Sequence, residues 1–334
     1  MNAHTRQFQE SSAVRGAVPL LVGLMGPSGG GKTFSALRLA TGIQQVSGGD
    51  IWVIDTEAER ARHYDDKFKF RHIGFGAPFG PLDYLAAINF VKQQGAGVVV
   101  VDSMSHEHEG PGGVLEMHDR ELDRMAGQDY GKRNAMNLLA WGKPKAERRS
   151  LINGILQIKG NFIFCFRAKE KVKPIKRNGK SEVENQGWMP IAGEEFVFEQ
   201  TVNCLLLPGS RGLPTWASEN PGERAMMKLP EQFRSLFAKE QALSEEIGRT
   251  LATWAQGGAA SIPAEKINTG ALIAQGNEAA GGGMSVLETW WKGLKGAEQK
   301  ALKDELPKFK TLAAEAEKDA DQRGGELALE GSNG

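Results

Sequence analysis

Residues 19–217 predict an α/β fold with a mostly parallel central sheet, because short apolar runs alternate there with helical patterns. Two of the runs, Val98–Val101 and Phe162–Phe166, are apolar throughout, as expected of strands buried on both faces of such a sheet. A glycine-rich segment also joins the first apolar run to the first helical pattern. The alternation predicts strands at 20–25, 51–55, 71–75, 98–102, 161–167 and 202–207, and helices at 34–45, 81–94, 113–125 and 144–159.

The glycine-rich segment is the most specific motif. It reads Gly26-Pro27-Ser28-Gly29-Gly30-Gly31-Lys32-Thr33 and matches the phosphate-binding pattern G-x-x-x-x-G-K-[ST] at every fixed position. Its glycines let backbone N–H groups wrap closely around a phosphate, because no Cβ intrudes. Lys32 is expected to reach the β- and γ-phosphates, and the Thr33 hydroxyl to ligate Mg²⁺. The predicted ligands are therefore ATP and Mg²⁺, with the loop and the following Phe34 in contact with the nucleotide.

Two acidic residues follow apolar strands that should end at the same edge of the sheet as this loop. Asp102 ends the run 98–102 and is the predicted second Mg²⁺ ligand, opposite Thr33. Glu57 follows the strand 51–55 and is suited to orient a water for attack on a γ-phosphate. An alternative remains open, in which Asp55 and Glu57 only cap the next helix.

With these motifs in order, residues 19–217 resemble the RecA-type recombinase ATPases. The matching segments are Asp55-Thr56-Glu57 and Val101-Asp102-Ser103. The stretch Asp102–Gly110, with the Gly-Gly-Val-Leu-Glu that follows it, looks like bacteriophage RecA-like ATPases associated with single-strand-annealing recombination or replication. The resemblance implies a RecA-like P-loop NTPase core, Glu57 as the catalytic base, and a ring or filament of identical subunits.

The chain departs from that family at the end of the strand 161–167. The family usually has a glutamine there that senses the γ-phosphate, whereas this strand ends in Arg167, a candidate replacement in contact with the nucleotide. Lys169 and Lys171 match the Lys-x-Lys pair that such assemblies place on a neighbour's γ-phosphate, which implies a catalytic role across a subunit interface. The alternatives for this pair are contact with a DNA backbone or simple solvation.

The charge distribution predicts a nucleic-acid partner although the net charge is zero. Between Gly131 and Lys180 there are fourteen basic and two acidic residues, so the rest of the chain is acidic overall. The dipeptide Asn178-Gly179 predicts a basic β-hairpin suited to a phosphate backbone. The alternative is a solvated hairpin without a partner. The candidate contacts with single-stranded DNA are Lys173, Lys176, Arg177, Lys180, Arg148 and Arg149.

Composition suggests five parts. We expect a flexible arm at 1–18, the ATPase core at 19–256, a Gly/Ala-rich flexible linker at 257–283, a helical hairpin at 284–321 and a disordered tail at 322–334. The small hairpin is a possible docking surface for a protein partner. No apolar run of 18 residues and no apolar signal core are present, so we expect no membrane span and a cytoplasmic location, in a host cell if the chain is phage-encoded.

These patterns lead to one functional hypothesis and its rivals. The hypothesis is a Mg²⁺-dependent, DNA-stimulated ATPase that acts on single-stranded DNA in phage-type recombination or replication. One rival is a ring-shaped replicative helicase or translocase, which would share the same motifs. The other is a non-hydrolysing switch that binds ATP and recruits partners.

Overall fold

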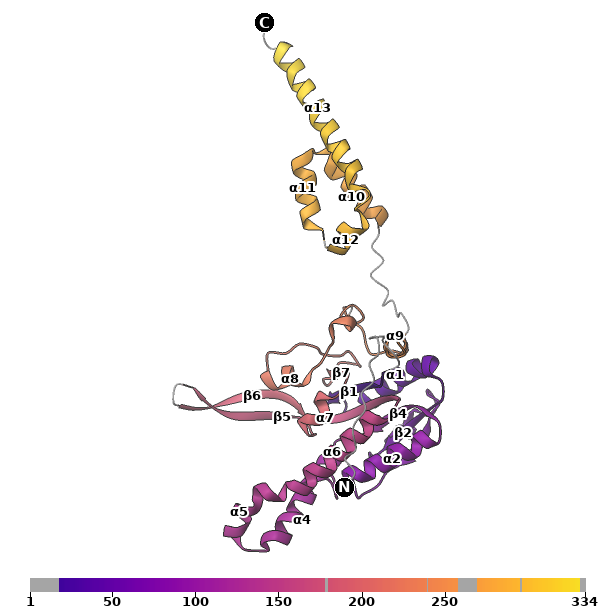
Figure 1. The fold of residues 1–334 in the computed structure, drawn as a ribbon, viewed down its shortest axis with the longest axis vertical. Coiled ribbons are helices and arrows are strands. Elements are labelled where there is room, and N and C mark those ends of the chain that lie inside the picture. The colour runs from indigo at the N-terminus through magenta and orange to yellow at the C-terminus, as the bar shows by residue number, and fades with distance from the viewer. Residues whose placement is uncertain (1–17, 178–179, 239, 258–268, 295, 331–334) are drawn as a thin grey trace, which may run out of the picture. The chain divides into compact units, whose positions relative to one another are not determined.

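A computed structural model describes residues 18–177, 180–238, 240–257, 269–294 and 296–330 of the chain (Figure 1). The chain divides into two compact units, Met1–Ile262 and Pro263–Gly334. The predicted arm 1–18 lies outside the described residues except for Val18, whose N–H donates to the carbonyl of Ala255 at 2.8 Å.

The first unit is built on one sheet, in which the described residues form seven strands. Six of them follow the order β3-β2-β4-β5-β1-β7 with every neighbouring pair parallel, and β6 pairs antiparallel with β5. The predicted fold class, an α/β core with a mostly parallel sheet, is therefore confirmed. The strands are β1 (Leu20–Gly26), β2 (Asp50–Asp55), β3 (Arg71–Gly74), β4 (Ala96–Asp102), β5 (Asn161–Arg177), β6 (Lys180–Pro190) and β7 (Val202–Leu205).

Helices cover both faces of this sheet, and the alternation of side chains along β4 shows why its sequence is continuously apolar. Val98 and Val100 pack in the core beneath α1 and α9, whereas Val99 and Val101 pack in the core beneath α2 and α6. All four are fully buried, as a strand between two helical layers requires. The helices of this unit are α1 (Lys32–Ser47), α2 (Pro81–Gln93), α3 (His106–Glu109), α4 (Val114–Ala126), α5 (Tyr130–Ala140), α6 (Gly142–Gln157), α7 (Glu194–Phe198), α8 (Pro221–Met226) and α9 (Glu245–Ala255), with short 3-10 helices at η1 (Arg60–Tyr64) and η2 (Glu231–Phe233).

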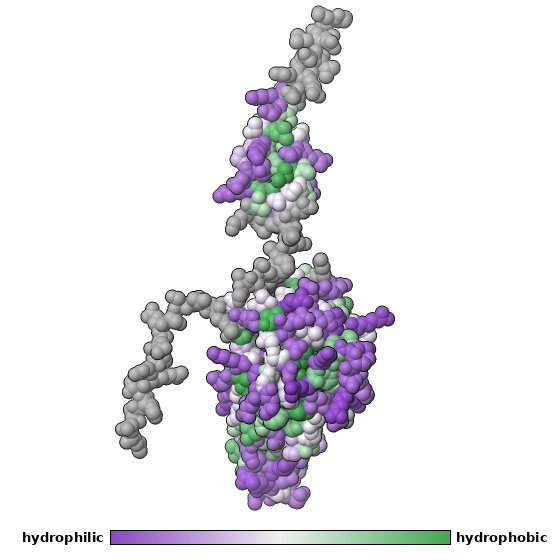
Figure 2. Space-filling view, turned by 90° about the vertical axis from the view of Figure 1, so that its right-hand side faces the viewer, coloured by the Kyte–Doolittle hydropathy of each residue, from purple (hydrophilic) through white to green (hydrophobic). Residues whose placement is uncertain are grey.

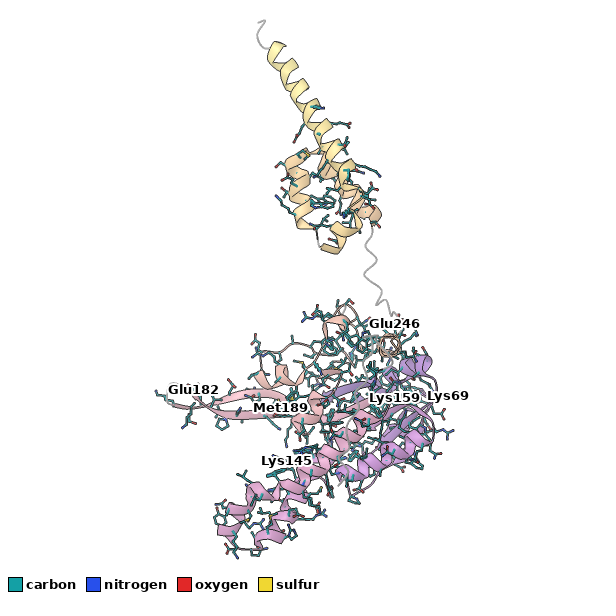
Figure 3. The ribbon with its side chains drawn as sticks, in the orientation of Figure 1. Lys69, Lys145, Lys159, Glu182, Met189 and Glu246 are labelled. Atoms are coloured by element: carbon teal, nitrogen blue, oxygen red, sulfur yellow. The ribbon has the colours of Figure 1, made fainter. Side chains whose placement is uncertain are left out.

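Two pairs of elements project from this core (Figure 1). Helices α4 and α5 pack together, and α5 lies outside the predicted elements. Strand β5 continues ten residues past its predicted end at Arg167, and this extension pairs with β6 from Ala168↔Pro190 to Arg177↔Lys180. The predicted hairpin is thus confirmed; Figure 3 labels Met189 near its base and Glu182 near its far end. Its predicted turn residues, 178 and 179, lie outside the described residues.

In the second unit, helices lie within two segments for which no regular structure was predicted. Residues 258–268 lie outside the described residues, but Thr269–Gly281 form helix α10 where a flexible linker was predicted. The small residues of α10 permit close packing: Ala279 and Ala280 are buried, and a Cβ on Gly276 would lie 2.6 Å from the ring of Phe309. Helix α13 reaches Glu330, within the segment where a disordered tail was predicted. The remaining helices are α11 (Met284–Gly293), α12 (Gly296–Ala301) and α13 (Leu306–Glu330), the last of which is rich in the helix formers Ala, Glu, Lys and Leu.

The surface of the first unit is largely hydrophilic on the face shown in Figure 2, with small hydrophobic patches between polar side chains. No helix among the described residues combines the length and the apolar character needed to cross a bilayer. The two cysteines, Cys165 and Cys204, are buried in the core and unpaired. Both lie in strands of the sheet, β5 and β7, where they pack as small apolar side chains.

Candidate active site

The candidate site is a cavity at the carboxyl ends of the parallel strands. The sheet order places the end of β5 between those of β1 and β4, with β2 beyond β4. The register aligns Gly26 with Arg167 and Asp102 with Asp55, so the predicted site residues meet at one edge although they are far apart in sequence. The cavity is lined by Ser28, Gly29, Gly31, Lys32, Thr33, Glu57, Arg60, His63, Tyr64, Asp102 and Arg167.

The glycine-rich loop forms the floor of the cavity and leads directly into α1. Gly29 and Gly31 have φ angles of 78° and 82°, in the left-handed region that favours glycine. A Cβ on Gly30 would lie 2.5 Å from the carbonyl oxygen of Leu206, so this glycine lets the loop pack against the chain after β7. No side chain in the described residues caps the start of α1, and its first turn holds no acidic residue. Its amino-terminal N–H groups and dipole therefore favour an anion.

Lys32 and Thr33, the first residues of α1, face the cavity from the loop. The Lys32 ammonium donates to the carbonyl oxygens of Gly26 and Pro27, both at 2.9 Å. The Thr33 hydroxyl donates to a carboxylate oxygen of Asp102. Asp102 is 5% exposed, and this burial raises its pKa to about 6 although Thr33 and Lys32 act in the opposite direction. A hydroxyl and a carboxylate converging from two elements are the oxygen ligands that Mg²⁺ prefers.

The segment after β2 places Glu57 in the cavity, whereas Asp55 stabilises the backbone of that segment. The Asp55 carboxylate accepts from the N–H groups of Glu57 at 2.7 Å and Ala61 at 2.9 Å. Arg62 donates to Nδ1 of His72 at 3.3 Å, which leaves the other ring nitrogen, Nε2, to donate to Asp55 at 3.2 Å. The capping alternative thus holds for Asp55, whereas the Glu57 side chain lines the cavity.

Arg167 lies opposite Glu57 and pairs with it. Its Nε is 2.9 Å from Oε1 of Glu57, and its Nη2 donates to Oε2 at 3.3 Å. A second guanidinium, that of Arg60, lies 3.8 Å from the same carboxylate. The cavity therefore brings together the cations Lys32, Arg60 and Arg167, a charge that suits a polyphosphate.

Some predicted contacts do not line this cavity. The ring of Phe34 packs against Phe68 at 5.3 Å and Tyr64 at 5.8 Å between centroids, so it supports the 3-10 helix η1 rather than the cavity wall. Lys169 and Lys171 are exposed on the extension of β5, where Lys169 lies 3.7 Å from Glu109. They remain candidates for a neighbouring subunit's site, which the single chain does not test.

The structure contradicts one of the predicted DNA contacts, Arg148. It was predicted to contact DNA, but it is 5% exposed and donates through Nε and Nη2 to both oxygens of Glu107, at 3.0 and 2.9 Å. The same Nη2 lies 2.8 Å from Nδ1 of His108. Burial raises the pKa of Glu107 while Arg148 holds it down, and burial together with Arg148 lowers the pKa of His108 to about 4. The network anchors α3, directly after the Asp102 segment, to α6. Its neighbour Arg149 is exposed.

Three residues that line the cavity are not among the predicted site residues: Arg60, His63 and Tyr64. They lie on η1, a single short helix with no periodic pattern to reveal it. The only available signal was their position within seven residues of Glu57 in a segment rich in charged and aromatic side chains.

Comparisons with known proteins add little to this description of the site. No family model matches the chain, and no curated protein matches it. Among solved structures, one that it resembles is a KaiC-like protein from the hyperthermophilic archaeon Pyrococcus horikoshii OT3. The two share 15% sequence identity over 52% of this chain and 88% of that chain, with a TM-score of 0.26. A score of that size supports no inference about function.

Proposed function

We propose that the protein is a Mg²⁺-dependent RecA-like ATPase that acts on single-stranded DNA as a homo-oligomer, in phage-type recombination or replication. The observation that carries the ATPase part is the convergence of Lys32, Thr33, Asp102 and Glu57 on one cavity at the end of a parallel sheet. They come from three motifs, the glycine-rich loop and the two acidic strand ends, and each supplies a group that phosphoryl transfer to water requires.

In this proposal, each group of residues has a separate role in ATP hydrolysis. The N–H groups of the loop and Lys32 bind and neutralise the phosphates of ATP. Thr33 and Asp102 would hold Mg²⁺, which supplies charge neutralisation at the phosphates. Glu57 orients a water and accepts its proton as the water oxygen bonds to the γ-phosphorus and the bond to the β,γ-bridging oxygen breaks, releasing ADP and phosphate.

A measurement of ATP turnover with and without single-stranded DNA tests this proposal. We expect turnover in the parent, stimulation by single-stranded DNA, and a fall of about 10²–10⁴-fold in the Glu57→Gln variant, because the amide cannot accept the proton. Parent turnover no higher than that of Glu57→Gln would instead indicate a non-hydrolysing switch. Directional unwinding of a duplex would indicate a helicase.

The DNA part rests on the hairpin formed by β6 and the extension of β5. Its two strands carry six basic and three acidic residues, so its positive charge is smaller than that of β5 alone. Residues paired across an antiparallel ladder share a face. Lys173, Arg177 and Lys180 therefore share one face with Glu182 and Glu184, whereas Lys176 lies on the other. The face with three basic residues is the better candidate for a phosphate backbone.

This geometry gives a salt-dependence prediction. The double variant Lys173→Ala/Lys180→Ala should bind single-stranded DNA more weakly and reduce the slope of log affinity against log salt by about 1.4, since each lost phosphate contact removes about 0.7. Lys176→Ala should change the slope less. Fluorescence anisotropy at several salt concentrations measures both, with Lys303→Ala/Lys310→Ala, two exposed lysines of the second unit, as the control. An unchanged slope in the first variant would exclude this face as the contact.

A further inference from the structure

The Glu57–Arg167 pair has a geometry that an ordinary surface ion pair lacks. The guanidinium contacts both carboxylate oxygens, with Nε 2.9 Å from Oε1 and Nη2 donating to Oε2 at 3.3 Å, and the Glu57 side chain is only 15% exposed. Because both oxygens lie against the guanidinium, the carboxylate has fewer lone pairs directed toward a water in the cavity. Glu57 in this arrangement is poorly placed to act as a base.

Arg167 is also held where it can serve a second partner. Its backbone N–H donates to Oγ of Ser105 at 2.9 Å and its carbonyl accepts from the N–H of Ile191 at 2.8 Å, so its main chain is anchored at the end of the parallel sheet. The register places it beside Gly26, where the glycine-rich loop begins. Its side chain is 40% exposed and lines the same cavity as Lys32. The guanidinium can therefore change partners without movement of the backbone.

A triphosphate in this cavity would present a second anionic partner to Arg167. Guanidinium forms paired hydrogen bonds with phosphate as readily as with carboxylate, and a γ-phosphate carries more negative charge than Glu57. A diphosphate lacks that group. The two nucleotides would therefore differ in their ability to draw Arg167 from Glu57.

We propose that Arg167 is a two-position gate: it pairs with Glu57 until a γ-phosphate takes its guanidinium, and this transfer frees Glu57 to orient water only when a triphosphate is bound. The inference rests on the proposed ATPase function and adds a positioning role for Arg167. By thermodynamic linkage, Glu57 and the triphosphate weaken each other's interaction with Arg167. Breaking the pair costs binding free energy, so Glu57 should weaken the binding of a triphosphate through Arg167.

Nucleotide affinities, measured by calorimetry with Mg²⁺ and either ATPγS or ADP, test this gate without a readout of activity. Arg167→Ala should lower ATPγS affinity about 10-fold while ADP affinity changes less than about 3-fold, because only the triphosphate loses a partner. Glu57→Gln should raise ATPγS affinity about 3- to 10-fold, because the uncharged amide releases Arg167. Glu59→Gln, the same change on an exposed neighbour paired with Arg62, is the control and should have no effect.

The double variant Glu57→Gln/Arg167→Ala separates the gate from simple repulsion between Glu57 and the phosphates. If the gate exists, the gain from Glu57→Gln shrinks or disappears without Arg167. An equal gain in both backgrounds would overturn the gate, and so would an Arg167→Ala variant that loses ADP and ATPγS affinity equally. Arg167→Gln provides a second version of each comparison if the alanine variant does not fold. A parent that binds neither nucleotide would instead refute the proposed function itself, and the gate with it.

Discussion

Replacing Lys32 with alanine is expected to lower ATP turnover by at least about 10²–10³-fold, because the ammonium is the loop's positive charge toward the β- and γ-phosphates. The fold should survive. The Lys32 side chain is partly exposed and its hydrogen-bond partners are the carbonyl oxygens of Gly26 and Pro27, which water can solvate when the amine is removed. Steady-state turnover and a circular dichroism melting curve of the same variant measure the two effects separately.

The chain offers a matched control for that experiment. Lys92, on α2, also donates its ammonium to a backbone carbonyl, that of Ala96 at 2.7 Å, but Ala96 begins β4 at the opposite end of the sheet from the cavity. Lys92→Ala should therefore leave turnover within about twofold of the parent, since its amine reaches no phosphate. Equal turnover in Lys32→Ala and the parent would remove the assignment of the cavity as an ATPase site.

The largest effect on stability is expected at Arg148. Its side chain and that of Glu107 are 6% and 5% exposed, and the two make a bidentate pair. Arg148→Ala leaves a buried carboxylate without its counter-charge, a change that costs about 3–5 kcal/mol of unfolding free energy. Urea denaturation of the full chain, followed by circular dichroism, measures the loss.

Two further variants make this result specific. Arg149→Ala removes an exposed arginine from the next position of the same helix and should change stability by less than about 0.5 kcal/mol. The double variant Glu107→Leu/Arg148→Met removes both charges together and should recover most of the loss, because no unpaired charge remains. If Arg148→Ala costs no more than Arg149→Ala, the pair does not anchor α3 to α6.

The convergence of the site could be predicted from sequence because it depends on a rule of topology. Parallel strands present their carboxyl ends at one edge, so Gly26, Asp102 and Glu57, each read as the residue at or just after a strand end, had to approach one another. The apolar run Val98–Val101 likewise predicted a strand buried on both faces. In the hairpin, the dipeptide Asn178-Gly179 lay between two strands that do pair.

The failures share a different cause, which is that a charge in a sequence does not show its partner. Arg148 lies in a basic segment and resembled a DNA contact, but Glu107, 41 residues earlier, packs against it inside the core. The acidic residues Glu182 and Glu184 of β6 lie on the same hairpin face as Lys173 and reduce its charge.

The glycine and alanine residues of α10 suggested a flexible linker for a similar reason. In the structure, these residues let α10 pack closely on Phe309.

By itself, then, the sequence determined the α/β class, the phosphate-binding loop and the residues at the ends of its strands, because periodicity and strand direction are local properties. Only the tertiary structure decided which charged side chains face solvent, which are neutralised in the core, and that Arg167 pairs with Glu57. Those outcomes depend on pairs of residues distant in sequence, and their energies arise only when the sheet brings the two partners within hydrogen-bonding distance.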